Sequence, residues 1–562
     1  MRRFAVLAAA LIGASAAMFS VLSVNQAIAN IQAELPLVDL EPRWILNAYL
    51  VALSVPMLAA GALGDRFGRR SVLLWGSLLF AGASAAVALV ENVDHLIAVR
   101  AVQGIGAALL VPSTLSTLSD AFPDGSSRGF SVGLWAALST VAFAAGPITG
   151  VWILEQGHNW RWFFYVNAIA GALAFLLGMA APKVRGYSGR HLDVSGLLLG
   201  TLGIGLLAYA LVEGNFTGWR QELTAGALLA GAFFLVVFLL VESHKSNSMV
   251  LLPLSNSGTF PAANAVATMN FLALLGISVF LPTYFRNLLG YPTDVSFLRL
   301  VPFAGLILVV APVAGMVSEK AGSRLLMTFG NLLAAGGLGL LLQARLQADY
   351  ESDVLPALVL MGFGFALSVG PLTTATVGVV QDFHAGGASG ATGSARLIGI
   401  LLGIGLLGAV VMTAFRNGLA ADLAAAGIDT ATAQRVAESP EAAAVLGGGS
   451  FEPLRNTLAP GTPPNVGDQV LGVARDSFLD AVNTGMLMSI GFLLLAAVIA
   501  LIFVRSHVIS LFRVESEKSP PEGRAPVEPT PAAAAVPASD PEPTPRVVEL
   551  PPPGEGEVAE KP

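Results

Sequence analysis

Long apolar stretches, separated by short polar or glycine-rich segments, recur along most of the chain. About 20 consecutive apolar residues are enough for a helix to cross the hydrocarbon core of a bilayer. The pattern therefore predicts an all-α polytopic membrane protein. We expect fourteen spans, at residues 6–29, 45–63, 72–91, 95–118, 130–152, 162–181, 194–213, 223–242, 260–283, 296–317, 324–343, 354–378, 393–415 and 483–504.

The first apolar stretch follows Met1, Arg2 and Arg3, a basic start that also occurs in secretory signal peptides. Its apolar character continues to Ile31, well beyond the short core of a signal peptide. We therefore expect a retained span, with a cleaved signal as the alternative.

The composition supports a lipid environment. Hydrophobic residues make up 54% of the chain and charged residues only 12%, whereas a soluble protein carries about 25% charged residues. The 61 glycines fit the same interpretation, because small residues let transmembrane helices approach closely.

Lysine and arginine concentrate in every second loop, as the positive-inside rule requires when the N-terminus is cytoplasmic. Arg66, Arg70, Arg128 and Lys183 are examples. An even number of spans then puts both termini in the cytoplasm, and we expect the plasma (inner) membrane as the location.

The arrangement of the stretches predicts four regions. Residues 1–182 form an N-terminal six-helix bundle, and residues 183–254 form an inserted helix pair with its loops. Residues 255–513 form a C-terminal six-helix bundle that contains a long outer loop, 416–482. Residues 514–562 are rich in Pro, Glu and Ala with few large apolar groups, so we expect a disordered tail.

Several function classes lack support in the sequence. The chain has no cysteine, and its six histidines are scattered, so we expect no metal site and no cofactor. No Ser/His/Asp, Cys/His or paired-carboxylate constellation is visible, so we expect no enzyme. Most of the net charge of −7 comes from the tail, so nothing indicates nucleic-acid binding, and no obligate protein partner is evident.

One loop pattern occurs twice, after the second and the tenth expected spans. Glycine, acid, glycine and arginine recur at the same spacing in Gly61–Arg70 and Gly315–Arg324. This repeat indicates two related halves, as in many secondary transporters.

With these motifs the chain resembles the major facilitator superfamily, and within it the fourteen-helix drug:proton antiporters. The segment Gly61–Arg70 is similar to the loop signature of that superfamily, and residues 96–106 resemble its fourth-helix motif. Residues 146–150 resemble its fifth-helix antiporter motif, and residues 160–167 resemble the entry to helix six. The resemblance implies a two-lobed bundle that works by alternating access.

The resemblance also implies a conformational latch at the repeated loops. Asp65 is expected to face the first turn of the thirteenth span, at residues 386–394, and Arg69 or Arg70 to pair with Asp120. The alternative is that these charges only hold the loops in register. The expected latch residues are Gly61, Asp65, Arg69, Arg70, Asp120, Gly315, Glu319 and Arg324.

Polar and aromatic side chains inside the expected spans are candidates for a substrate cavity. Arg100 is the most conspicuous, because a cation inside a membrane needs a partner; the alternative is that it reaches the membrane surface. Each of the others has a simple packing role as its alternative. The candidates are Ser20, Asn25, Gln26, Tyr49, Arg100, Gln103, Trp135, Asn264 and Asn270.

Two further expectations concern movement and coupling. Gly146 and Pro147 interrupt the hydrogen-bond ladder of the fifth span, so they predict a helix bend, either for the antiport movement or for packing. Proton-coupled members of the family usually carry a carboxylate in helix one, where this chain has Ser20. Glu213 is the nearest remaining candidate for a proton site.

Three functions remain open on the sequence. The first is a secondary exporter of lipophilic or amphipathic small molecules, for which the resemblance implies proton coupling although no carboxylate lies in the middle of an expected span. The second is a uniporter, or a differently coupled transporter, of one metabolite or lipid. The third is a non-transporting membrane receptor or assembly factor that uses the outer loop and the tail.

Overall fold

The structure is a computed structural model, and it describes residues 1–35, 41–123, 125–183, 193–217, 219, 221–245, 258–343, 348–378, 385–446, 449–458 and 464–505. Within these ranges the regular elements are helices, and no strand occurs. The tail predicted at 514–562, and residues 447–448 and 459–463 of the predicted outer loop, lie outside the described residues.

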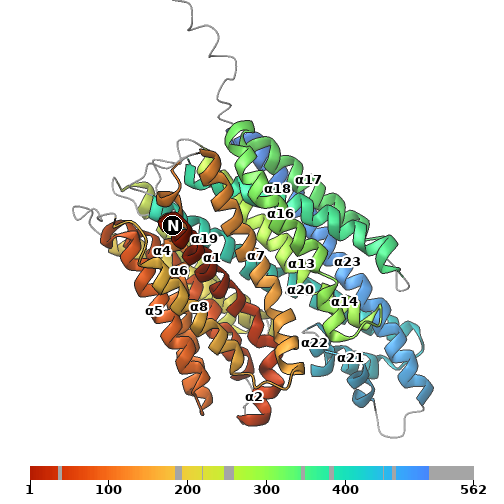
Figure 1. The fold of residues 1–562 in the computed structure, drawn as a ribbon. Helices are drawn as coiled ribbons and strands as arrows, with labels where there is room; N and C mark the ends of the chain where they lie inside the picture. The colour runs from red at the N-terminus through yellow and green to blue at the C-terminus, as the bar shows by residue number, and fades with distance from the viewer. Residues whose placement is uncertain are drawn as a thin grey trace, which may run out of the picture. The chain divides into compact units, whose positions relative to one another are not determined.

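The first helices of the chain pack mainly on one another, with α6 in contact with α1, α3, α4 and α5. The long helix α7 lies along α1, and α8 packs on α1 and α5. This group, coloured red to orange in Figure 1, consists of α1 (Arg2–Leu22), η1 (Ser23–Ala27), α2 (Ile28–Glu34), α3 (Glu41–Ser54), α4 (Met57–Phe67), α5 (Arg69–Ala88), α6 (Val93–Ala121), α7 (Gly125–Glu155) and α8 (Trp162–Gly178).

A second group is formed by later helices, in which α18 packs on α16 and α17, and α23 packs on α12, α17 and α20. It is coloured green to blue in Figure 1. Its members are α12 (Thr259–Asn270), η2 (Phe271–Leu275), α13 (Gly276–Ser278), α14 (Leu281–Asn287), α15 (Thr293–Leu298), α16 (Val301–Ala321), α17 (Ser323–Leu341), η3 (Tyr350–Val354), α18 (Leu355–Gly378), α19 (Ala385–Leu402), η5 (Gly403–Leu407), α20 (Gly408–Ala425) and α23 (Pro464–Phe503).

The two groups meet mainly along α7 and α4 of the first group, with smaller contacts of α6 with α19 and of α7 with α15. Helix α7 of the first group packs on α16 and α18, and α4 packs on α19. The pair α9 (Val194–Thr217) and α10 (Glu222–Ser243) lies against both groups, because α9 contacts α3 and α4 on one side and α19, η5 and α20 on the other.

Two kinds of irregularity interrupt the helices near this interface. The stretch expected as one straight span at 45–63 is bent by 43° between α3 and α4, next to Pro56. Proline lacks the backbone N–H and disfavours a helical residue before it, so a bend there has a direct cause. In the second group, η2 and η5 are π-helical turns that contact each other. Such turns occur frequently at functional sites.

The described part of the predicted outer loop is a compact helical cap rather than an irregular connection. Helices α21 (Thr430–Glu438) and α22 (Pro440–Leu446) and the 3-10 turn η6 (Glu452–Thr457) pack between the extended ends of α20 and α23. Phe415, Val436 and Phe478 are buried there. The cap lies at the opposite end of the bundle from the N-terminus (Figure 1).

The number of membrane-crossing helices is smaller by strict criteria than the sequence predicts. Among the described residues, eleven helices are long and apolar enough to cross a bilayer, and the bent pair α3–α4 makes a twelfth. Two further helices, Trp162–Gly178 and Ser195–Leu211, are apolar but shorter. The first of these is the 17-residue helix α8, and the second is the apolar part of the 24-residue helix α9.

Candidate functional site

The repeated loops form two sharp turns of the same geometry. Gly68 connects α4 to α5 with φ 90°, and Gly322 connects α16 to α17 with φ 83°. Positive φ values are readily adopted by glycine and are strained for other residues. The glycines at the third position of the repeat are therefore required by the backbone at both turns.

Asp65 contacts the first turn of α19 through two hydrogen bonds. The amide of Gly386 donates to Oδ1 at 3.0 Å, and the amide of Gly387 donates to Oδ2 at 2.9 Å. The first amides of a helix have no partner within the helix, and they carry the positive end of its dipole. The carboxylate, which is 3% exposed, therefore joins the first group to the second at a site suited to an anion.

The crossing of α4 and α19 is possible because both helices present glycine. A Cβ on Gly61 would collide with the carbonyl oxygen of Gly386, and a Cβ on Gly386 would collide with Asp65. Any side chain at either position would push the two helices apart, so Gly61 is needed for the hydrogen bonds of Asp65.

Arg69 lies between two carboxylates within the first group. Its guanidinium is 3.6 Å from Asp65 and donates a hydrogen bond to Asp120 at the end of α6. The sequence left open which arginine meets Asp120, and the structure assigns this contact to Arg69. Arg70 is half-buried, and no partner of its side chain is found among the described residues.

The second turn produces an equivalent crossing between α16 and α7. A Cβ on Gly315 would lie 2.5 Å from the carbonyl oxygen of Gly129, and a Cβ on Gly129 would lie 2.5 Å from the carbonyl oxygen of Gly315. Glu319 pairs with Arg128 in the first turns of α7, at 3.7 Å. Arg324 takes no part in an ion pair within the described part of the chain. The acids of both repeats thus lie beside the first turn of a helix of the opposite group.

Arg100 lies entirely inside the first group and does not reach the membrane surface, because it is 0% exposed. It donates to the carbonyl oxygen of Ile45 at 3.1 Å, to the Ser20 hydroxyl at 3.0 Å and to Gln103 at 2.7 Å. The ring of Tyr49 lies 4.4 Å from the guanidinium carbon. Neutral groups of α1, α3 and α6 therefore satisfy this cation without a carboxylate.

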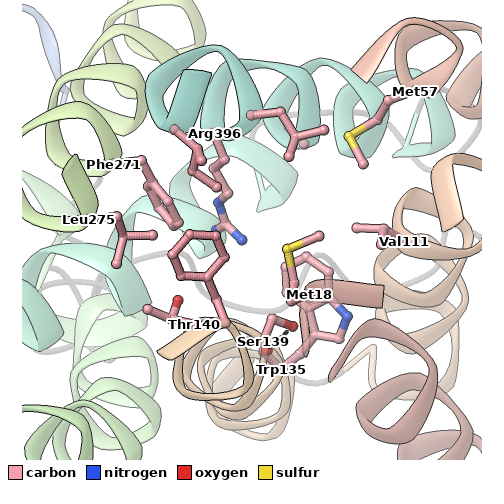
Figure 2. Close-up of a pocket in the computed structure, with 13 residues that line it drawn as sticks. Met18, Met57, Val111, Trp135, Ser139, Thr140, Phe271, Leu275 and Arg396 are labelled. Carbon is pink, nitrogen blue, oxygen red and sulfur yellow. Dashed lines mark hydrogen bonds between the residues drawn. The ribbon is translucent and has the colours of Figure 1, made fainter. Parts of the chain in front are cut away.

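A small cavity lies between the two groups, at about 30 Å³ of space for water-sized molecules. Figure 2 shows its walls, which come from α1, α4, α6 and α7 on one side and from η2 and α19 on the other. The lining is mostly apolar, with Arg396 as its charged member. It consists of Met18, Met57, Val111, Trp135, Ser139, Thr140, Phe143, Phe271, Leu275, Gly393, Arg396, Leu397 and Ile400.

Of the nine residues expected at a substrate cavity, the structure brings only Trp135 to this one. Ser20, Tyr49, Arg100 and Gln103 form the buried network inside the first group. They are absent from the cavity because their polar atoms are used between helices of one group.

The remaining candidates in this set lie elsewhere. Asn25 is exposed, and Gln26 packs beside Gly150 of α7. Asn264 donates to the carbonyl oxygen of Phe260 at 3.0 Å within α12, and Asn270 donates to Ser368 at 2.8 Å. Gln26 and Asn270 thus contact neighbouring helices, whereas Asn264 bonds within its own helix and Asn25 is exposed.

At Gly146 and Pro147, where the sequence predicts a helix bend, the structure shows a close contact between two helices. Helix α7 runs without interruption from Gly125 to Glu155, with Pro147 inside it. A Cβ on Gly146 would lie 2.9 Å from the carbonyl oxygen of Phe19 and 3.0 Å from the amide nitrogen of Ser23. Gly146 thus allows α7 to approach the first span closely.

Glu213 is buried in α9 and is 3% exposed. It does not line the cavity between the two groups. No group of three potential metal ligands occurs among the described residues.

Sequence reasoning missed Arg396, the cation at the cavity. It lies within the expected span 393–415. A charged residue inside an apolar stretch is the signal that could have identified it. Met18 and Met57 gave no such signal, because methionine inside an apolar span is typical of helix packing.

Comparison with known proteins supports what these features indicate. Residues 5–404 match the family described as Major Facilitator Superfamily. The multidrug resistance protein Stp of Mycobacterium tuberculosis (strain CDC 1551 / Oshkosh) is 31% identical over 69% of this chain and 72% of its own length. The tetracenomycin C resistance and export protein of Streptomyces glaucescens is 30% identical over 91% of both chains.

Among solved structures, a proton:xylose symporter of the superfamily, XylE, has a similar fold. The TM-score is 0.50 at 18% identity, and the match covers 79% of this chain and 93% of that one. The third alternative, a non-transporting receptor or assembly factor, is not supported by these relatives. The protein is a multi-pass membrane transporter, not an enzyme, and it belongs to the major facilitator superfamily.

Proposed function

We propose that this transporter exports lipophilic or amphipathic small molecules across the plasma membrane by alternating access. The observation that carries the proposal is the largely apolar cavity between the two helix groups, closed toward one end by the contact of Asp65 with α19. Relatives named for resistance to tetracenomycin C and puromycin support the direction of export.

In this proposal the membrane holds fourteen spans, with both termini in the cytoplasm. The eleven long helices, the bent pair α3–α4 and the two shorter apolar helices supply that number. A helix of 17 residues is about 25 Å long, which is close to the roughly 30 Å of the hydrocarbon core. The turns at Gly68 and Gly322 are then cytoplasmic.

The two helix groups act as lobes, which are residues 1–182 and 255–513, while residues 183–254 supply an inserted pair. Asp65 and Glu319, with the glycine crossings beside them, latch the lobes together on the cytoplasmic side. A drug-sized ligand needs a pocket of roughly 300–1,000 Å³. The cavity of about 30 Å³ must therefore enlarge by separation of the lobes before a substrate enters.

The proposal is tested with everted membrane vesicles from cells that express the transporter. We expect time-dependent accumulation of several unrelated amphipathic dyes, and no accumulation in vesicles without the protein. Absence of transport for every dye, with correctly inserted and monodisperse protein, would contradict export of this substrate class.

A second candidate function is transport of a single metabolite or lipid without proton coupling. It is favoured by the absence of any carboxylate from the lining residues of the cavity. Collapse of the proton gradient with an uncoupler separates the two functions, since only a proton-coupled exporter stops. If transport is coupled, Glu213→Gln tests Glu213 as the proton site, and loss of uncoupler sensitivity with retained downhill transport is the expected result.

A further inference from the structure

Arg396 is a buried cation that points into the cavity between the two groups (Figure 2). It lies in α19 and is 7% exposed. One amino group of its guanidinium donates to the hydroxyl of Thr373 in α18. The rings of Trp135 and Phe271 lie 5.2 and 5.5 Å from the guanidinium carbon.

No carboxylate within the described ranges lies at ion-pair distance from Arg396, and its Nε has no hydrogen-bond partner there. A guanidinium has five N–H donors, and Thr373 takes one of its amino groups. A buried charge with so few partners is expensive in a low-dielectric environment. The other N–H donors of Arg396 therefore have no protein acceptor at hydrogen-bond distance within the described ranges.

The rest of the cavity suits the apolar part of a ligand. Met18, Phe143 and Leu275 contribute apolar surface. The indole N–H of Trp135 donates a hydrogen bond to the hydroxyl of Thr114 at 3.0 Å, and its ring face stays free for stacking. Ser139 and Thr140 add two hydroxyls opposite the arginine, on α7. A fixed positive charge among apolar and aromatic walls is complementary to an amphipathic anion.

We infer that Arg396 binds the anionic group of the substrate, and that the transporter prefers amphipathic organic anions, above all aromatic carboxylates. A planar carboxylate accepts two parallel hydrogen bonds from a guanidinium, which a neutral amide does not match in strength. A lipophilic cation is disfavoured, because it would meet the positive charge of Arg396 in a low-dielectric cavity. This inference rests on the exporter function proposed above.

The experiment compares three dyes that share one aromatic ring system and differ in charge. They are dansylglycine (an anion), dansylglycinamide (neutral) and dansylamidoethyl-trimethylammonium (a cation). Their affinities for the purified full-length protein are measured by fluorescence titration, and their transport is measured in proteoliposomes. For the wild type we expect dansylglycine to bind at least about tenfold more tightly than the amide, and the cation to bind most weakly.

Arg396→Gln removes the charge, and we expect the preference for the anion over the amide to fall to within about twofold. The affinity for the neutral amide is expected to stay within about threefold, which also shows that the variant is folded. Arg396→Lys keeps the charge without the planar fork, so an intermediate preference is expected. Arg416→Gln is the matched control, because it removes a positive charge from α20 outside the cavity lining, and its selectivity should equal that of the wild type.

The outcomes separate the inference from the proposed function. Transport of the amide or the cation without any preference for the anion overturns the inference and leaves the exporter function standing. An anion preference that is unchanged in Arg396→Gln also overturns it. Failure of the wild type to bind or transport all three dyes overturns both. If Arg396→Gln does not yield folded protein, Arg396→Met replaces it as a neutral variant, and an anion preference equal to that of the wild type in Arg396→Met contradicts the inference.

Discussion

Arg100 and Arg396 are both buried among the helices of this protein, and their surroundings differ. Arg100 is enclosed within one helix group, where Ser20, Ile45 and Gln103 accept its hydrogen bonds. Arg396 lies where the two groups meet, and Thr373 accepts its hydrogen bond. Removal of either charge from water is costly, so the number of partners that the protein supplies indicates what each residue does. We therefore expect Arg100 to hold the first helix group together, and Arg396 to be available to a ligand as proposed above.

The largest expected difference between the two sites is in accessibility. The natural chain has no cysteine, so single cysteines report on one position each. Ser139→Cys puts a thiol at the cavity, and Ser84→Cys puts one beside Gln103 in the network of Arg100. We expect a water-soluble maleimide to modify the first at least about 100-fold faster, because only the interface opens without unfolding a lobe. Equal labelling rates would contradict the comparison.

The next effect concerns stability. Arg100→Ala leaves a cavity and an unpaired Gln103 oxygen inside the first group, and we expect a loss of about 3 kcal/mol. Arg396→Ala removes a charge with few partners, so we expect a change within about 1 kcal/mol. Thermal unfolding of both variants in detergent measures this. An Arg396→Ala protein that is destabilised as much as Arg100→Ala would show that both arginines are structural.

We expect the proposed latch at Asp65 to control access to the site of Arg396. Asp65→Asn removes the charge from the two hydrogen bonds with α19. We expect the state in which the cytoplasmic side is closed to be destabilised by about 2 kcal/mol relative to the open state. That difference corresponds to roughly a 30-fold shift in population, since 1.4 kcal/mol is a factor of ten. Labelling of Ser139→Cys from the cytoplasmic side should accelerate accordingly, while transport is lost. Unchanged labelling together with normal transport would rule out a latch.

The smallest effect is expected at an arginine near the surface. Arg161 donates to Glu34, and this hydrogen bond holds the pKa of Glu34 below its usual value. A lowered pKa stabilises the folded state above the unfolded pKa of about 4.3, and this contribution is lost as the pH falls through the lower folded value. Because Glu34 is largely exposed, we expect a change of less than about 1 kcal/mol. Unfolding measured between pH 3 and 6 for the wild type and Glu34→Gln checks this, and a large acid destabilisation unique to the wild type would contradict it.

The repeated loop was readable from the sequence because its chemistry is local. Gly68 and Gly322 are required by the backbone of a sharp turn, and an acid that follows an apolar helix is suited to a helix N-terminus nearby. The contact of Asp65 with the first turn of α19 followed from that pattern together with the resemblance, whereas the choice between Arg69 and Arg70 as partner of Asp120 did not. The bend at Pro56 and the π-helical turn η2 were not predicted, because tertiary packing decides which interruptions of a helix are tolerated.

The sequence by itself determined that this is a multi-pass helical membrane protein with two related turns, because apolar runs and turn glycines are local features, and the resemblance of its motifs implied transport. Only the tertiary structure decided that Arg100 is satisfied within one lobe and that Arg396 faces the cavity. The reason is that lipid and protein interior are both apolar. A membrane helix therefore shows little amphipathic pattern to mark its inner face, and the packing of its neighbours determines which polar groups meet.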